Sequence, residues 1–253
     1  MKRDKGSSGG PRLLVLDSSY TIDTIRKLGL EQSVLCRDLD GYFDHVWSVH
    51  PFGDINARPV PAGQPRSTRL GERHSFIQAQ PGRFRLLERW FTANFALGQL
   101  DLFRRLRRLV KDERITLIRA GDPLYVGLLG LLLARATGVR FAIRINANND
   151  KIRETTRKPI YPRLLRTERI EKAIEHFVLP RADLVAAPNQ DNVDFAVANG
   201  ARPDRVTIFR YGNLLSPAHL AEPRERGTDN ALFKRLGVEP GRYLLCVSRL
   251  QTL

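Results

Sequence analysis

The chain has little cysteine and no long hydrophobic run. Its 253 residues include only Cys36 and Cys246, too few for a disulfide scaffold, and this scarcity fits a reducing compartment. The longest apolar run, residues 124–134, has 11 residues, whereas a helix needs about 20 to span a bilayer. Only four apolar residues follow the basic N-terminus, too few for a signal-peptide core. We therefore expect a cytoplasmic protein that is soluble or lies peripherally on the inner face of the membrane.

Motifs for common cofactors are also missing. After the first predicted strand the sequence reads DSSYTIDTI, without the glycines that let a backbone approach a dinucleotide. There is no Walker motif, no Cys-x-x-Cys and no His-Glu-x-x-His, so neither a P-loop nor a structural zinc site is supported. His45 and His50 flank a predicted strand, and we expect turn or surface roles for them. We expect no cofactor and no metal.

The charge, by contrast, is strongly basic. The sequence has 42 Lys and Arg, 34 of them Arg, against 27 Asp and Glu, a formal net charge of +15. Residues 58–114 and 140–181 together carry 14 of these net charges. Solvated helix faces and a surface for an anionic partner both remain open. Nucleic acid is disfavoured, because the aromatic residues of 84–103 fall on a predicted apolar helix face.

Short apolar runs alternate with longer helical patterns, which is typical of a parallel sheet with crossover helices. The predicted strands are residues 13–16, 46–49, 75–77, 115–118, 141–145, 184–187, 206–209 and 243–247. The predicted helices are residues 22–30, 84–110, 123–136, 163–179, 193–198 and 231–236, and residues 53–72 are predicted as a surface loop. We predict an α/β fold with a Rossmann-like parallel sheet and helices on both faces. The divisions expected are a domain over 12–212, a linker over 213–228 and the beginning of a second, truncated domain over 229–253.

Polar residues follow four of the predicted strands. In open parallel sheets, ligands bind at the carboxyl ends of strands, so these residues predict a cleft for a polar ligand. Helix caps and turns use the same residue types, and that structural role stays open for each one. The four groups are residues 17–20, 121–122, 146–150 and 188–191. Glu171 and Glu175, one helical turn apart near Arg169 and Lys172, are expected to form ion pairs.

One stretch of the sequence resembles a known family. Residues 182–213 read ADLVAAPNQDNVDFAVANGARPDRVTIFRYGN, similar to the retaining glycosyltransferases of family four, which have the GT-B fold. In that family an Ala-Asp-x-Val strand is followed, after a helix, by Gly-(Ala/Val)-x-Pro-x-(Lys/Arg)-(Val/Ile). The upstream IRAGDPLYVGLLGLLLARATGVRFAIRI and the C-terminal YLLCVSRL also resemble family elements, so the likeness covers about residues 113–253.

This resemblance implies two facing Rossmann-like domains with the active site between them. The N-terminal domain would hold the acceptor and the C-terminal domain the nucleotide-sugar, a co-substrate whose diphosphate Arg249 would bind. Such enzymes typically need no metal ion. Because the 253 residues contain little of the donor-binding domain, we expect no transferase activity from them alone.

The sequence departs from the family pattern at three places. Residues 17–20 replace a glycine-rich loop, Gly121 and Asp122 stand where the family has an acceptor-side histidine, and Pro188 and Asn189 replace a serine turn. We predict Asp122 as a residue near the reacting centre, with capping of the following helix as its alternative role. The residues predicted to bind substrate are Ser18, Ser19, Tyr20, Asn146, Asn148, Asn189 and Arg249.

The expected function is retaining transfer of a hexose from a nucleotide-sugar to a hydroxyl acceptor, a glycan or a lipid-linked glycan, in polysaccharide or glycolipid synthesis. The Arg-bearing faces of 84–110 and 163–179 fit docking on anionic lipid. The alternative is a non-catalytic, basic Rossmann-like module that binds a polyanion or a membrane surface.

Overall fold

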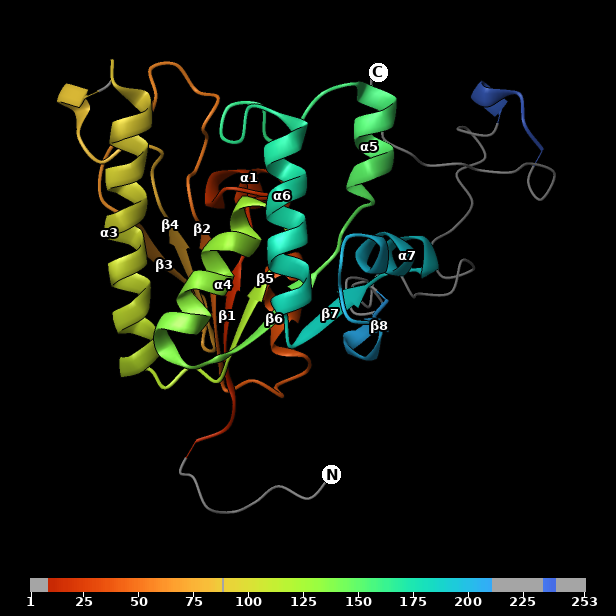
Figure 1. Ribbon diagram of the computed structural model, residues 1–253, viewed down its shortest axis with the longest axis horizontal. Helices are drawn as coiled ribbons and strands as arrows, with labels where there is room; N and C mark the ends of the chain where they lie inside the picture. The colour runs from red at the N-terminus through yellow and green to blue at the C-terminus, as the bar shows by residue number, and fades with distance from the viewer. Residues whose placement is uncertain (1–8, 88, 211–233, 240–253) are drawn as a thin grey trace. The chain divides into compact units, whose positions relative to one another are not determined.

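The central element of the chain is one eight-stranded sheet (Figure 1). The computed structural model describes residues 9–87, 89–210 and 234–239. The strands are β1 (Arg12–Leu16), β2 (His45–His50), β3 (Arg66–Gly71), β4 (His74–Gln78), β5 (Leu117–Ala120), β6 (Arg140–Arg144), β7 (Leu184–Ala187) and β8 (Val206–Ile208). Their order is β3-β4-β2-β1-β5-β6-β7-β8, and every neighbouring pair is parallel except β3 with β4. The predicted Rossmann-like fold is confirmed.

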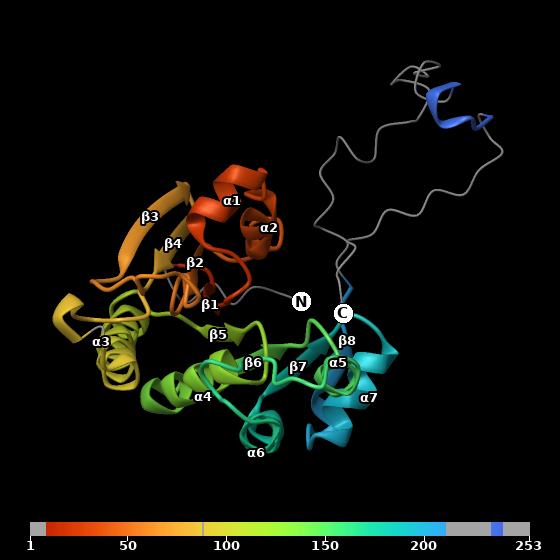
Figure 2. The same ribbon diagram turned by 90° about the horizontal axis from the view of Figure 1, so that it is seen from above.

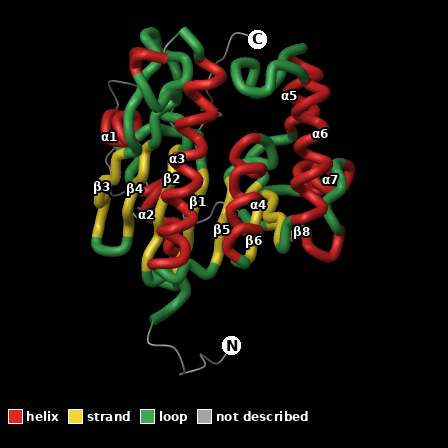
Figure 3. The backbone as a smooth tube through the Cα atoms, turned by 60° about the vertical axis from the view of Figure 1, so that its left-hand side comes forward, coloured by secondary structure: helices red, strands yellow, loops and turns green. Residues whose placement is uncertain are grey.

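Helices cover both faces of this sheet. They are α1 (Ile22–Leu28), α2 (Gln32–Leu35), α3 (Phe91–Asp112), α4 (Tyr125–Thr137), α5 (Asn149–Thr156), α6 (Glu168–Val178) and α7 (Gln190–Ala198). Figure 2 shows α1 and α2 on one side of the sheet and α3, α4 and α6 on the other. Figure 3 shows α4 lying between α3 and α6, both of which it contacts. The largest hydrophobic core lies between these three helices and the sheet.

The strand order reverses direction beside β1. From β1 the chain proceeds outward through β2 to β4 and β3, then returns to place β5 on the other side of β1 and continues outward to β8. The loops that follow β1 and β5 therefore leave the sheet side by side in opposite senses. Such a switch point opens a crevice at the carboxyl ends of the strands, where ligands bind in this class of fold.

The central helix α4 is nearly all apolar because it is buried against the sheet and two other helices. Leu124, Val126 and Leu133 are fully buried, as expected for the predicted helix over 123–136. A Cβ atom added at Gly130 would lie 2.7 Å from the Phe141 ring on β6 and 3.3 Å from Leu16 on β1. The absence of a side chain at Gly130 thus lets α4 approach the middle of the sheet.

Several elements differ from those predicted. The expected surface loop over 53–72 contains an edge strand, β3, and α5 was not predicted at all. The helix expected over 163–179 begins only at Glu168, after Thr167 caps it. The helix expected over 84–110 begins only at Phe91, so its first apolar residues lie outside it. The predicted linker over 213–228 and the strand over 243–247 lie outside the described residues. Of the helix expected over 231–236, residues 234–236 are described and are helical.

The apolar face predicted for the helix over 84–110, which corresponds to α3, is also partly wrong. The exposed fractions are 98% for Leu86, 70% for Trp90, 41% for Leu97 and 45% for Leu100. α3 does bury Leu106 and Val110, which the predicted face included, but it also buries four residues outside that face: Asn94, Gly98, Gln99 and Leu102. Apolar spacing alone selected an incorrect face because two polar side chains on the buried face make hydrogen bonds with the segments packed against it.

Two helical glycines provide a test of this packing. We expect Gly130→Ala to lower the free energy of unfolding by about 1–3 kcal/mol, because its methyl group would overlap the Phe141 ring. Gly98→Ala is the matched control: its nearest neighbours would lie 3.6 Å away, and the substitution should stabilise α3 by about 0.5–1 kcal/mol. Urea denaturation followed by circular dichroism measures both, and equal effects of the two substitutions would contradict the close packing of α4.

Candidate functional site

A cleft of about 420 Å³ lies at the carboxyl ends of β1 and β2. Three segments form its walls: residues 18–24 after β1, residues 50–56 at the end of β2, and residues 160–164 before α6. The third wall is tied to the second, because the Arg163 guanidinium donates a hydrogen bond to the carbonyl of Ile55. The cleft is therefore built at the switch point of the sheet, from segments far apart in the sequence.

Three side chains form a hydrogen-bonded chain from the cleft toward the loop after β5. The Tyr161 hydroxyl donates to Asp122 Oδ2 at 2.8 Å and lies 2.8 Å from the hydroxyl of Ser18. Asp122 Oδ1 accepts the backbone N–H of Leu124 at 2.8 Å, just before α4. Because the Tyr161 proton is directed to the carboxylate, the Ser18 hydroxyl is the donor to Tyr161. We refer to Ser18, Tyr161 and Asp122 as the hydroxyl relay.

Burial dominates the protonation of this relay. It raises the pKa of Asp122 to about 6, even though the hydrogen bonds from Tyr161 and Leu124 favour the ionised form. Burial and the nearby Asp122 carboxylate raise the pKa of Tyr161 well above its usual value, so this phenol keeps its proton. A carboxylate that titrates near neutrality beside a neutral phenol is suited to accept a proton.

A second carboxylate near the cleft has the opposite tendency. Burial alone would raise the pKa of Asp17, but the Arg37 guanidinium, 2.6 Å from Asp17 Oδ2, and hydrogen bonds from Ser19 lower it. Arg37 also donates to Ser48 on β2. Asp17 is thus a permanently charged support for the loop that carries Ser18, whereas Asp122 can change its charge near neutral pH.

The floor of the cleft at β2 is a buried histidine beside an aromatic cluster. His50 is 3% exposed, and its Nδ1 accepts the backbone N–H of Gly53 at 2.9 Å. Burial lowers the pKa of His50, so the ring is neutral at neutral pH. Phe52 packs edge-on against His50, Tyr125 and Tyr161, with ring centroids 5.5, 5.7 and 6.3 Å away. The surface role expected for His50 is therefore wrong, whereas its hydrogen bond to the backbone three residues on fits the expected turn role.

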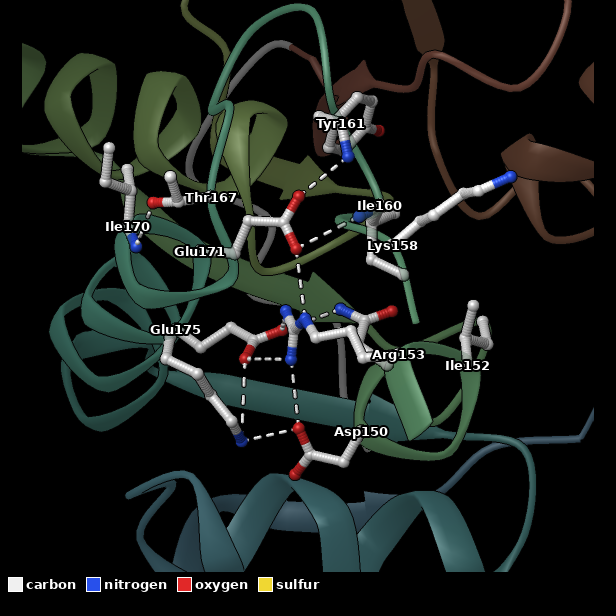
Figure 4. Close-up of polar contacts among 12 residues, drawn as sticks. Asp150, Ile152, Arg153, Lys158, Ile160, Tyr161, Thr167, Ile170, Glu171 and Glu175 are labelled. Carbon is white, nitrogen blue, oxygen red and sulfur yellow. Dashed lines mark hydrogen bonds and ion pairs between the residues drawn. The ribbon is translucent and has the colours of Figure 1, made fainter. Parts of the chain in front are cut away.

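A buried ion-pair network holds Tyr161 in place (Figure 4). Glu171 on α6 is fully buried; one of its carboxylate oxygens accepts the backbone N–H of Tyr161 at 2.7 Å, and the other accepts that of Ile160 at 3.0 Å. The second oxygen also accepts Nε of Arg153, on α5, at 3.0 Å. Arg153 in turn makes two hydrogen bonds to Glu175, of 2.7 and 3.0 Å. The network fixes the backbone of residues 160–161, and with it the relay.

The expected ion pairing of Glu171 and Glu175 is confirmed, but the main partner was missed. Arg169 makes no ion pair among those found in the described residues, and Lys172 Nζ lies 4.0 Å from Glu175. The partner of both glutamates is Arg153, which is 18 and 22 residues away in the sequence. It belongs to α5, the helix that the apolar pattern did not reveal because only Asn149 and Arg153 are buried in it.

The structure brings together some of the predicted site residues and separates others. Ser18, Ser19 and Tyr20 line the cleft, and Asp122 reaches it through Tyr161. Asn146 lies behind this region, where its amide donates to the carbonyl of Gly121 at 2.9 Å.

The other two asparagines predicted to bind substrate do not line the cleft. Asn148 caps α5 and Asn189 caps α7, each through its side-chain oxygen. Arg249 lies outside the described residues. The substrate roles of all these residues stay predictions.

Sequence reasoning missed most of two walls of the cleft. His50 ends β2, and Phe52 and Asp54 come soon after it, the same signal that identifies the other polar groups, but the sequence predicts only a turn or surface role for His50 and a surface loop from residue 53. Tyr161 had no local signal, since its position depends on Glu171.

In the described part of the chain, no helix has the length and apolar character needed to cross a bilayer. The same residues contain no group of three potential metal ligands.

Comparisons with known proteins agree with this architecture. Residues 20–212 match a family described as the glycosyl transferase 4-like domain. The fold is similar to HepE from Anabaena, solved with UDP (TM-score 0.53) and with UDP-glucose (TM-score 0.51); the identity is 14%, and the match covers 89% of this chain and 50% of HepE in both cases. The chain thus spans about half the length of these solved structures. No curated protein matches its sequence.

The Arg153 network predicts a large effect on stability. Arg153→Met should lower the free energy of unfolding by about 3–5 kcal/mol, because it leaves two fully buried glutamates without their cation. Arg105→Met, which removes an exposed ion pair with Asp101, should cost about 0–1 kcal/mol. Urea denaturation at pH 7 compares them. Similar losses for the two variants would mean that the buried network does not support the fold.

The relay predicts a titration near neutral pH. We expect the carboxyl carbon of Asp122, observed by ¹³C NMR, to titrate at about 6, and Tyr161→Phe to move the midpoint upward because the phenol favours the ionised form. Because the pKa of Asp122 is higher in the folded protein than its ordinary value of 3.8, protonation of this carboxyl favours the folded state. The contribution of Asp122 to the free energy of unfolding is therefore full below pH 3.8 and is lost as pH rises through about 6. Asp122→Asn should therefore lose less stability than the native protein between pH 4 and 7, and a midpoint near 4 would contradict the burial of Asp122.

Proposed function

The chain belongs to the glycosyl transferase 4-like family, and we propose that it forms the acceptor-side domain of an enzyme that moves a sugar from a nucleotide-sugar to a hydroxyl group, with retention. The observation that carries this proposal is the cleft at the switch point of the sheet, where Ser18 and Tyr161 of the hydroxyl relay line the cleft wall. The crevice lies where α/β sheets of this type bind ligands, and its chemistry suits a polyhydroxylated molecule.

The cleft wall offers closely spaced polar groups beside aromatic rings. Hydroxyl groups come from residues 18–24, a carboxylate and an amide come from Asp54 and Asn56, and Tyr20 and Phe52 add aromatic surface. A sugar presents hydroxyls that both donate and accept, so mixed hydrogen-bonding groups on a rigid apolar base provide both affinity and orientation. This composition supports a glycan or glycolipid headgroup as the acceptor.

The relay supplies a route for a proton. As the acceptor hydroxyl forms its new bond to the sugar, the bond between that sugar and the nucleotide diphosphate breaks and the nucleotide leaves. The hydroxyl must also lose a proton, and Ser18 at the cleft can accept it while passing its own proton to Tyr161. Tyr161 would then pass its proton to Asp122, whose pKa of about 6 leaves it mostly ionised at neutral pH. We therefore assign Asp122 the role of proton acceptor near the reacting centre.

The donor is proposed from the family and from one neighbour. HepE, which shares the fold, has been solved with UDP-glucose, and this supports a nucleotide-sugar donor for the present chain. Arg249 is proposed to bind the donor diphosphate, because a guanidinium makes charge-assisted, bidentate hydrogen bonds to phosphate oxygens. Synthesis of a polysaccharide or glycolipid is the proposed context.

Binding of soluble glycosides tests the acceptor site without requiring turnover. We expect methyl and octyl hexosides to give saturation-transfer NMR signals with the 253-residue chain, and Ser18→Ala or Tyr161→Phe to weaken binding about tenfold, because each leaves a polar group in the cleft without its partner. Tyr42→Phe, at a half-exposed tyrosine on the loop before β2, is the matched control and should bind as the native chain does. No binding of any hexoside, together with tight binding of polyphosphate, would favour the non-catalytic polyanion module.

A further inference from the structure

The two most exposed large apolar side chains of the described residues lie just before α3. Leu86 is 98% exposed and Trp90 70%, and the nearby Phe84 is 49% exposed. They belong to a short segment, residues 83–91, that includes a single turn of 3-10 helix over Arg85–Leu87. Clusters of this kind are uncommon on a surface that faces only water, and they mark contact with a partner or a membrane.

The first residues of this exposed segment are anchored to α3. The buried side chain of Asn94 accepts the backbone N–H groups of Arg83 and Phe84, each at 2.8 Å, and donates to the carbonyl of Phe84 at 2.8 Å. A side chain added at Gly82 would collide with this amide, at 2.6 Å. The three hydrogen bonds fix the backbone of residues 83–84, which leads directly into the turn that carries Leu86.

Basic residues surround the apolar ones. Residues 83–91 contain three arginines and one glutamate, and residues 157–166 contain four basic residues and no acidic one, a net charge of +6 for the two segments. We call these two segments together the arginine–aromatic rim. They meet where the Arg163 guanidinium lies over the ring of Phe91, 5.9 Å from its centroid. Arg163 also lines the cleft, so the rim is continuous with the cleft wall.

Both parts of the rim lie at the end of the sheet toward which its parallel strands point (Figure 1). The cleft lies at this same end, after β1 and β2. The Arg-rich second half of α3, residues 104–111, lies toward the opposite end of the sheet (Figure 1). The basic residues of 163–166 belong to the loop before α6 and not to a helix face, because α6 begins at Glu168. The Arg-bearing helix faces over 84–110 and 163–179, which the sequence predicts to dock on lipid, are therefore a different surface from the rim.

We propose that the arginine–aromatic rim docks on an anionic lipid bilayer, with Leu86 and Trp90 in the interfacial zone and the arginines against the headgroups. The combination of exposed Trp, Leu and Phe side chains with arginines in the same segment matches the chemistry of a membrane interface, where indole rings prefer the headgroup level. The positive charge of the rim complements anionic headgroups, each basic residue near such a surface strengthening binding about fivefold.

Docking in this way places the mouth of the cleft beside the bilayer. An acceptor carried by a lipid could then enter the cleft past Arg163 while its tail stays in the membrane. This step rests on the proposed function, whereas the docking itself does not, because it depends only on the rim.

The two tryptophans of the chain allow a direct test. Trp90 is 70% exposed in the rim and Trp47 is 7% exposed in the sheet. With vesicles of phosphatidylcholine containing 30% phosphatidylglycerol at low salt, we expect the chain to sediment with the lipid and brominated acyl chains to quench Trp90 fluorescence. The Trp47→Phe variant isolates this signal. Vesicles of phosphatidylcholine alone should bind at least tenfold more weakly, and failure to bind the anionic vesicles would overturn the proposal.

Matched variants separate the rim from general attraction. Arg85→Gln/Arg89→Gln should weaken vesicle binding about 30-fold, and Leu86→Ser/Trp90→Ser at least tenfold, with unchanged thermal unfolding. Arg104→Gln/Arg108→Gln removes the same charge from the distant part of α3, and Leu28→Ser/Leu132→Ser alters two exposed leucines elsewhere; both controls should bind nearly as the native chain does.

Equal losses from either rim variant and its control would refute docking through the rim. A dimer, detected by sedimentation velocity and abolished by Leu86→Ser/Trp90→Ser, would assign the surface to a second copy instead. Because the vesicles carry no glycoside, their result is independent of hexoside binding in the cleft, so failure of the docking proposal can be distinguished from failure of the proposed function.

Discussion

The candidate site depends on one buried carboxylate, that of Glu171. Its two oxygens accept the backbone N–H groups of Ile160 and Tyr161, and Arg153 balances its charge in a place that water does not reach. Residues 157–167 contain no regular helix or strand, so this carboxylate does what a regular element would otherwise do: it satisfies backbone donors and fixes the path of the chain. The tyrosine hydroxyl can therefore lie between a serine after β1 and an aspartate after β5.

The sheet provides the second requirement, because its switch point brings the ends of β1 and β5 together. Asp17 and Asp122 follow these neighbouring strands yet differ in charge behaviour. Arg37 compensates the first carboxylate, whereas the second receives only neutral hydrogen bonds and its pKa rises to about 6. One permanent charge and one that titrates near neutrality, within a single crevice, is an arrangement common in sites that move protons.

The segment before α3 illustrates how a sequence pattern can mislead. Leu86, Trp90, Leu97 and Leu100 have helical spacing, and apolar spacing normally identifies the buried face. The protein instead buries Asn94 and Gln99, whose amides make hydrogen bonds with the backbone of neighbouring loops, and exposes the apolar residues. Where local spacing and tertiary hydrogen bonding disagree, the side chains left outside are candidates for contact with another surface. Leu86 and Trp90 belong to the rim, which Arg163 joins to the cleft.

The sequence by itself determined the α/β class, seven of the eight strands and the idea that polar residues after strands form a cleft, because parallel sheets need apolar runs of fixed length with crossovers between them. It also placed Ser18, Ser19, Tyr20 and Asp122 near that cleft. Only the tertiary structure decided that Tyr161 joins them, that Asn148 and Asn189 serve as helix caps, and that Arg153 pairs with Glu171 and Glu175. These features arise from contacts between residues distant in the chain, and no local pattern encodes which backbone group or carboxylate a folded neighbour will bring within hydrogen-bonding distance.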